Sequence, residues 1–135
     1  MIPAITNVRA RLWTAFLACL LVPALSMASE MQPFDAAKFA SLQAENKPVA
    51  VVVHASWCGY CKKQIPVQAA LMRSPEFADF TMFVVDFDKD KDVLTRFNVI
   101  KQSTIIVFKG PKEVARTLGE TEREAIRATL LKGKS

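Results

Sequence analysis

Two cysteines stand three residues apart in "SWCGYCKKQIP", residues 56 to 66, and thiols at this spacing can exchange disulfides or bind a metal. A β-branched run ends just before Cys58, and a helical pattern begins near Cys61. The first cysteine then lies at a helix N-terminus, where unpaired N–H groups and the helix dipole favour a thiolate. The second lies one turn further along the same face, so it can attack a mixed disulfide. This spacing predicts Cys58 as attacking thiolate and Cys61 as resolving thiol.

The segments on both sides of the cysteines predict the elements that position them. The run "VAVVVHA", residues 49–55, is typical of a central strand buried on both faces. Residues 60–74 predict a helix that is kinked at Pro66, with Ile65, Ala69 and Met72 on one face.

The remaining chain predicts further strands and helices that complete one domain. Asp35 can cap a helix over 36–46, and Thr121 with Glu124 forms a capping box for a closing helix. The other expected elements are a short turn that opens at Ser74-Pro75, a strand over 80–88, a helix over 89–97, strands over 103–108 and 114–119 joined by a turn at 109–113, and the closing helix over 123–132. Phe83, Phe87, Phe97 and Phe108 are expected in the core. A parallel crossover followed by a hairpin predicts a mixed sheet between helices in an α/β domain.

The N-terminal segment has the pattern of a secretory signal. Arg9 and Arg11 precede an apolar run over residues 12–25, and small residues follow up to Ala28, where cleavage is expected. The run is shorter than the roughly 20 residues that span a bilayer, so an uncleaved membrane anchor is the less favoured alternative. We therefore expect a periplasmic or otherwise extracytoplasmic protein.

Cleavage divides the chain into a signal peptide, 1–28, and one domain, 29–135. Two of the 18 basic residues precede residue 29, so 16 basic against 13 acidic residues leave a net charge of +3. The charges alternate, as in "DKDKD", whereas a nucleic-acid binder concentrates Lys and Arg in a stripe, so we expect no nucleic-acid partner. Cys19 is removed with the leader. The two remaining cysteines are either disulfide partners or metal ligands, in a compartment that permits pairing.

These residues together resemble the thioredoxin superfamily over nearly all of the mature chain. "WCGYCK" is similar to its active-site signature, Pro66 to the proline of its active-site helix, and "FNVIKQSTIIVF" to the stretch that carries its cis-proline. The resemblance implies a three-layer α/β/α sandwich with a mixed central sheet and dithiol–disulfide exchange. It implies protein disulfide substrates and no cofactor or metal, with Trp57 flanking the nucleophile at the rim. We also expect a monomer.

Three positions depart from the family pattern. Ser103 and Thr104 occupy the place of its proline-threonine pair; because a cis bond before a non-proline residue costs about 3–4 kcal/mol, a trans Gln102–Ser103 bond and a reshaped groove are expected. Ser103 either hydrogen-bonds backbone or donates to the Cys58 thiolate and lowers its pKa.

The other two departures concern proton transfer and redox potential. Val52 occupies the position of the buried aspartate of classical thioredoxins. The nearest ionisable group is His54. Its side chain either replaces an aromatic packing surface or accepts a proton from the cysteines. Gly59 and Tyr60 lie between the cysteines, and this dipeptide tunes the redox potential.

Two functions therefore compete. The leading hypothesis is an exported thiol-disulfide oxidoreductase acting as a reductase, supplied with electrons by a membrane donor of the DsbD or CcdA type. The alternative is a metal or iron–sulfur module in which two chains each contribute Cys58 and Cys61, with sulfurs uncovered by the loss of the proline.

Overall fold

The computed structural model describes Met1 and residues 30–135. The predicted leader and Cys19 therefore lie outside the described residues, apart from Met1. The structure has ten elements in the described part: β1 (Met31–Pro33), α1 (Ala36–Ala44), β2 (Pro48–His54), α2 (Gly59–Met72), the short 3-10 helix η1 (Pro75–Phe77), β3 (Thr81–Asp86), α3 (Lys91–Arg96), β4 (Thr104–Lys109), β5 (Lys112–Leu118) and α4 (Arg123–Leu131).

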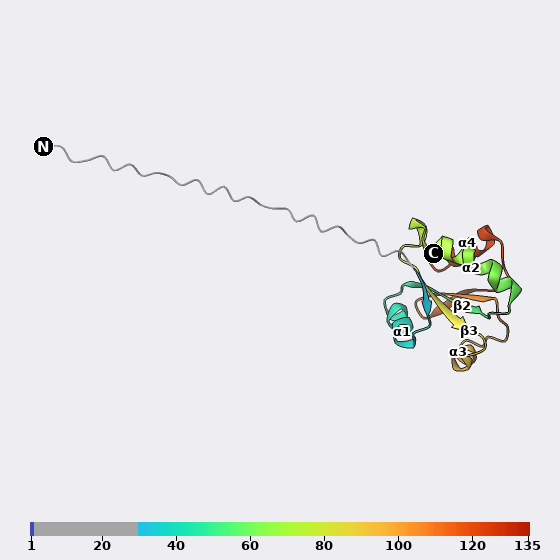
Figure 1. Cartoon of the computed structure of the whole chain (residues 1–135). Helices are drawn as coiled ribbons and strands as arrows, with labels where there is room; N and C mark the ends of the chain where they lie inside the picture. The colour runs from blue at the N-terminus through green and yellow to red at the C-terminus, as the bar shows by residue number, and fades with distance from the viewer. Residues whose placement is uncertain (2–29) are drawn as a thin grey trace.

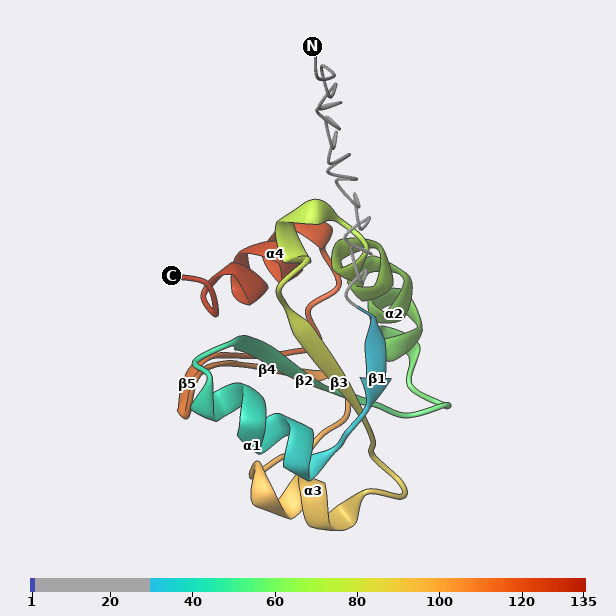
Figure 2. The same cartoon turned by 90° about the vertical axis from the view of Figure 1, so that its left-hand side faces the viewer.

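The strands form one mixed sheet with β2 at its centre. The strand order is β1-β3-β2-β4-β5, in which β2 runs parallel to β3 and antiparallel to β4. All seven residues of β2 are buried, as expected for an apolar strand that is covered on both faces. Helices α1 and α3 cover one face of the sheet, and α2 and α4 cover the other (Figures 1 and 2). The predicted three-layer α/β/α sandwich is thus confirmed.

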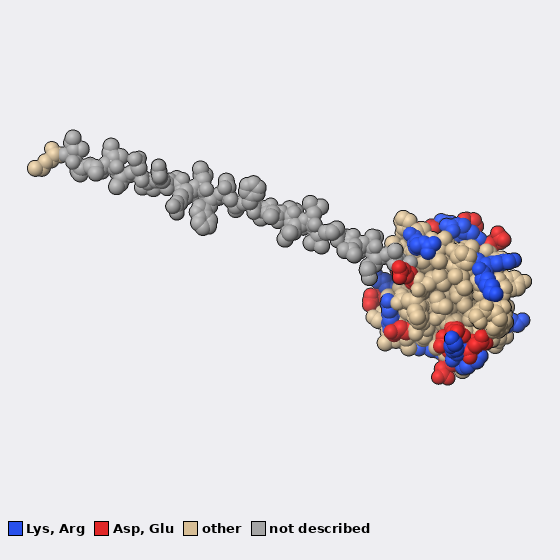
Figure 3. Space-filling view, viewed as in Figure 1, with Lys and Arg blue, Asp and Glu red and all other residues tan. Residues whose placement is uncertain are grey.

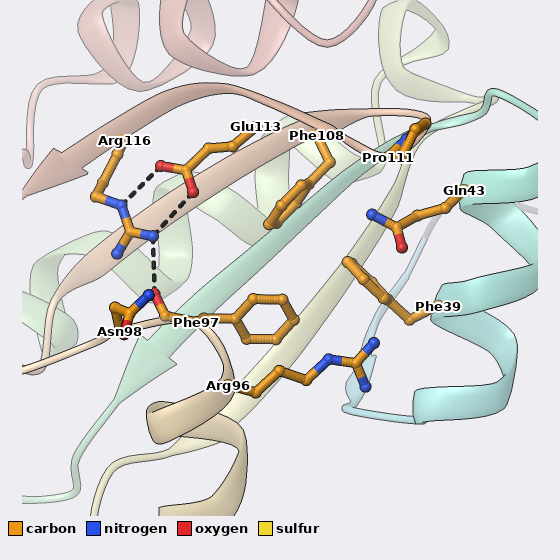
Figure 4. Close-up of a pocket in the computed structure, with 9 residues that line it drawn as sticks. All are labelled: Phe39, Gln43, Arg96, Phe97, Asn98, Phe108, Pro111, Glu113 and Arg116. Atoms are coloured by element: carbon orange, nitrogen blue, oxygen red, sulfur yellow. Dashed lines mark hydrogen bonds and ion pairs between the residues drawn. The ribbon is translucent and has the colours of Figure 1, made fainter.

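The layer between the sheet and the α1/α3 side is rich in aromatic rings. The ring centroid of Phe39 in α1 lies 5.3 Å from that of Phe97 and 5.2 Å from that of Phe108, both in T-shaped, edge-to-face geometry. The Arg96 guanidinium lies 5.4 Å from the Phe39 centroid and 5.5 Å from that of Phe97, and Figure 4 shows it extending below these rings. Among the described residues Arg96 makes no ion pair, so aromatic faces are its main contacts.

An arginine of β5 anchors the end of α3 to the same layer. Arg116 donates from Nε and Nη2 to the Glu113 carboxylate, and its Nη2 also donates to the Phe97 carbonyl at 2.9 Å (Figure 4). The pairing with Glu113 raises the pKa of Arg116, so the guanidinium stays charged. Because residues 98–103 follow Phe97 directly, this contact holds one end of the segment that leads to Ser103.

Several local predictions fail for identifiable reasons. Asp35 caps α1 as predicted, since its carboxylate accepts from the Lys38 N–H. The capping box at Thr121 and Glu124 is wrong: Glu120 supplies the carboxylate instead, accepting from the N–H groups of Thr121 and Glu122. Strand β1 was missed because three residues carry too little periodicity.

The buried face of α2 differs in part from the predicted one, since Met72 is buried as expected. Ile65 is 41% exposed, whereas Gln64 and Gln68 are fully buried, so this helix turns two amides toward the sheet. Pro66 lies inside α2, which continues to Met72; the kink stays a prediction. Of the four predicted core rings, Phe83, Phe97 and Phe108 are buried, and Phe87 is half-buried.

Charged side chains of both signs are interspersed on the surface. In Figure 3 red and blue groups gather over α3, beside an uncharged area of the same face. Within residues 30–135 no helix has the length and apolar character needed to cross a membrane.

Candidate active site

The two cysteines lie where β2 leads into α2. Cys58 is the N-cap residue of α2, and its Sγ accepts a hydrogen bond from the Cys61 N–H at 3.0 Å. The two residues form a disulfide with a Cα–Cα distance of 5.3 Å. Cys58 is 2% exposed and Cys61 is completely buried, so Cys58 lies nearer to solvent. This arrangement suits Cys58 as the nucleophile and Cys61 as the resolving thiol.

The helix N-terminus supplies the electrostatics of the site. An N-cap sulfur that accepts a backbone N–H lies at the positive end of the helix dipole, and both effects favour its thiolate. Within α2 the first turn contains no acidic side chain that would oppose this. The geometry therefore supports thiol–disulfide exchange once the disulfide is reduced.

Two exposed aromatic side chains flank the disulfide. Trp57 is 58% exposed, donates from Nε1 to Asp88 at 2.9 Å and contacts the Phe87 ring edge-on. Tyr60 is 59% exposed between the cysteines. A Cβ at Gly59 would meet no atom within 4 Å, so space does not require glycine there. Trp57 thus lies at the rim of the site as predicted, although its contact with a substrate stays a prediction.

Ser103 adopts a backbone conformation that a proline cannot take. None of the described residues has a cis peptide bond, so Gln102–Ser103 is trans, and Ser103 has φ +59°. Its N–H donates to the Val53 carbonyl at 2.8 Å, and its Oγ donates to the Gln102 carbonyl at 2.6 Å. The Ser103 hydroxyl therefore hydrogen-bonds to backbone, which was one of the two predictions for it. The neighbouring Thr104 is buried and donates from Oγ1 to the Lys101 carbonyl at 2.7 Å.

Tyr60 and Ser103 line a common groove beside the cysteines. It measures about 380 Å³, and Lys101, Gln102, Leu118 and Gly119 complete its lining. Gly119 has φ +71°, a conformation that favours glycine, and its N–H donates to the Ser103 carbonyl at 3.0 Å. The segments 101–103 and 118–119 thus lie side by side at the end of the β4–β5 pair and form one surface.

His54 pairs with a glutamine rather than with a cysteine. Its Nε2 lies 2.9 Å from Oε1 of Gln68, and because this oxygen only accepts, Nε2 carries the hydrogen. Burial lowers the pKa of His54, although the hydrogen bond to Gln68 opposes this shift, so the imidazole is neutral at pH 7. Val52, in the slot of the family's aspartate, is fully buried in the apolar core. The contacts favour a packing and hydrogen-bonding role for His54.

Gln64 is the residue that the sequence-based prediction missed. It is fully buried, and its Nε2 donates to the carbonyls of Ser103 and Glu120 at 3.2 and 2.7 Å. The available signal was the polar pair Gln64 and Gln68, four residues apart in a helix that should turn an apolar face inward.

The alternative metal module, which takes two cysteines from each of two chains, stays a prediction. It required sulfurs uncovered by the absent proline, but Cys58 and Cys61 are buried and paired. Within residues 30–135 no group of three or more His, Cys, Asp or Glu side chains is arranged to hold a metal ion.

Comparisons with known proteins agree with this geometry. Residues 30–132 match the family described as Thioredoxin. Thioredoxin of Mycobacterium bovis is 32% identical over 92 residues, which cover 68% of this chain and 78% of that protein. Thioredoxin-1 of Saccharomyces cerevisiae is 36% identical over 84 residues, covering 62% of this chain and 80% of the yeast protein. The match to the bifunctional thioredoxin reductase/thioredoxin of Mycobacterium leprae, 34% identical over 92 residues, covers 68% of this chain and 20% of that protein.

Solved structures extend the likeness to the fold. The crystal structure of Trxlp from Edwardsiella tarda EIB202 has a TM-score of 0.72 and 38% identity, covering 75% of this chain and 98% of that one. The chain belongs to the thioredoxin family. It is a thioredoxin-type thiol-disulfide oxidoreductase with its cysteine pair at disulfide distance.

Proposed function

We propose that this protein is an exported reductase that uses the Cys58–Cys61 dithiol to reduce disulfides in other proteins. The observation that carries the proposal is the Cys58 sulfur at the N-cap of α2, bonded to Cys61 one turn along the helix. This position favours the thiolate of Cys58, while the Cα–Cα distance of 5.3 Å keeps the second thiol in reach of the first.

The reaction proceeds by two exchanges. The Cys58 thiolate attacks one sulfur of a substrate disulfide, forms a mixed disulfide and expels the other substrate sulfur as a thiolate, which takes a proton from water. Cys61, after losing its proton to solvent, attacks the Cys58 sulfur and releases the second substrate thiolate. The substrate gains two electrons, and the protein is left with the Cys58–Cys61 disulfide seen in the structure.

The surface around the disulfide fits protein substrates. Trp57, Tyr60, Ile100 and Leu118 are all more than half exposed, and Tyr60 and Leu118 line the groove next to Ser103. Exposed apolar side chains near a reactive sulfur give a polypeptide substrate area to bury. The trans, left-handed Ser103 distinguishes this groove from one that is shaped by a cis-proline.

The direction of electron flow follows from the compartment. Outside the cytoplasm a dithiol stays reduced only if a donor supplies electrons, and a membrane dithiol donor of the DsbD or CcdA type would regenerate Cys58 and Cys61 by the same two exchanges. The apolar leader that ends near Ala28 supports export, and we expect the mature protein to be a monomer. N-terminal sequencing of protein recovered from the periplasm should begin at Ser29; a retained Met1 would contradict cleavage.

Reduction of insulin tests the catalytic assignment. Wild-type protein should precipitate insulin in the presence of dithiothreitol, and Cys58→Ser should fall to the uncatalysed rate because no attacking thiolate remains. Cys61→Ser serves as a matched control, since it retains the nucleophile and should accumulate a mixed disulfide that is visible by mass. Equal turnover by wild type and Cys58→Ser would remove the proposed function.

A further inference from the structure

Gln64 connects α2 to the two loops beside the disulfide. The side chain is fully buried, and its Nε2 donates to the Ser103 carbonyl at 3.2 Å and the Glu120 carbonyl at 2.7 Å. Both partners are acceptors, so only the amide NH₂ can satisfy them, and this fixes the orientation of the side chain. The Oε1 atom of Gln64 has no hydrogen-bond partner among the described residues, a cost that an apolar side chain would not carry.

The two loops that Gln64 joins form the groove beside the cysteines. Ser103 lines it on the β4 side, and Gly119, which precedes Glu120, lines it on the β5 side. These two sides are also joined by a hydrogen bond from the Gly119 N–H to the Ser103 carbonyl at 3.0 Å, next to the terminal β4–β5 pair Thr104 and Leu118. Removal of Gln64 would therefore leave these loops held by this bond and by the β4–β5 ladder alone, with no tie to α2.

Ser103 needs restraint from its surroundings. A non-glycine residue in the left-handed region costs about 1–2 kcal/mol, and such a conformation persists only where neighbouring contacts enforce it. Three hydrogen bonds to the Ser103 backbone do so. Its N–H donates to the Val53 carbonyl, and its carbonyl accepts from the Gly119 N–H and from the Gln64 side chain. The restraint that a proline ring supplies covalently is supplied here by hydrogen bonds.

We propose that Gln64 is a positioning residue for disulfide exchange, holding the Ser103 and Glu120 loops in the arrangement that receives the substrate polypeptide next to Cys58. The assignment rests on the proposed function. Gln64 does not touch the sulfurs in any described contact; it acts through the backbone of the groove.

The Gln64→Leu variant tests this role, and Gln68→Leu provides a matched control. Gln68 is the same residue type on the same helix and is equally buried, but its hydrogen bond goes to His54 and not to either loop. Loss of one to two hydrogen bonds at a docking surface should lower kcat/KM for insulin about tenfold in Gln64→Leu, mainly through a higher KM. Gln68→Leu should stay within about twofold of wild type.

Two further measurements separate positioning from general damage. Alkylation of reduced Cys58 by iodoacetamide should proceed at the wild-type rate in Gln64→Leu, because the helix N-terminus that activates the thiolate is intact. Amide hydrogen exchange at Ser103 and Gly119 should be faster in Gln64→Leu than in Gln68→Leu. If the leucine variant fails to fold, Gln64→Met fills the same space without a donor and repeats the test.

The outcomes distinguish this inference from the function on which it rests. Active wild-type protein with equal KM values and equal amide exchange in the two leucine variants would overturn the positioning role alone. Wild-type protein that cannot reduce any protein disulfide would overturn the proposed function and this inference together.

Discussion

On the side of the sheet covered by α1 and α3, the buried cluster is apolar throughout, whereas the side covered by α2 also buries Gln64, Gln68 and His54. The first side packs aromatic rings edge to face, and even its cation, Arg96, lies against rings. The second side combines an apolar cluster with hydrogen bonds that end at the groove beside Cys58.

The two sides of the sheet differ in what their buried residues contribute: the apolar side mainly stabilises the fold, and the polar side also positions loops. Burial of a large apolar side chain contributes about 1.5–3 kcal/mol, while a buried amide gains only about 0.5–1.5 kcal/mol per hydrogen bond and loses where an atom stays unpaired. Gln64 Oε1 and Gln68 Nε2 are both unpaired among the described residues. Polar burial close to the disulfide therefore stabilises the fold less than apolar burial would, and only Gln64 among these residues bonds the two loops.

The largest expected effect lies on the aromatic side. Phe39→Ala removes a ring that is 1% exposed and contacts four other phenylalanines, so the free energy of unfolding should fall by about 3–5 kcal/mol. Urea unfolding measures this loss. Below the unfolding transition, kcat/KM for insulin should remain at the wild-type value, because Phe39 lies in the layer away from α2.

The Phe39→Leu variant is the matched control for this test. Phe39→Leu preserves an apolar side chain and should cost less than the alanine variant, since a smaller void remains. A folded Phe39→Ala protein with strongly reduced kcat/KM would break the separation between the two sides.

Substitution at Ser103 has the next largest effect. Proline fixes φ near −65° and has no N–H, so Ser103→Pro opposes the observed φ of +59° and removes the bond to the Val53 carbonyl. We expect the free energy of unfolding to fall by about 2–3 kcal/mol, with a changed insulin KM. Thermal and urea unfolding, together with insulin kinetics, provide the measurement.

Glycine at the same position is the control. Ser103→Gly keeps the N–H and the carbonyl and adopts a positive φ without strain, so its unfolding free energy should lie within about 0.5 kcal/mol of wild type. Equal unfolding free energies for the proline and glycine variants would show that the left-handed backbone conformation of Ser103 does not affect the stability of the folded state.

The smallest effect is the pH dependence from His54. Burial lowers its pKa in the folded protein, so the unfolded chain binds the proton more readily. The stability from the neutral imidazole is complete above the unfolded pKa of about 6.5 and is lost as pH falls from there toward the lowered folded pKa, with a slope of at most about 1.4 kcal/mol per pH unit.

Urea unfolding between pH 7.5 and 5 measures this slope. His54→Phe, which has no titrating group, should show a flatter profile over the same range. Identical profiles for the two proteins would mean that His54 does not contribute to the pH dependence of folding.

Much of the fold was accessible from the sequence because it rests on local patterns. The apolar run of β2, the Asp35 cap and the hairpin before β5 each depend on neighbouring residues, and each appears near its predicted place. The error on α2 has a different origin. Hydrophobic periodicity assumes that buried faces are apolar, so it selected Ile65, whereas the packed helix buries Gln64 and Gln68.

What the sequence by itself determined is the reactive pair: a buried strand, a cysteine at the following helix start and a second cysteine one turn later are local in the chain, so their spacing suffices to place the two thiols together. Only the tertiary structure decided the groove. Ser103, Gly119 and Gln64 are far apart in sequence, and the hydrogen bonds that join them exist only after β4, β5 and α2 have packed together. A hydrogen bond between distant residues depends on distance and direction in the folded chain, and neither can be read from residue types.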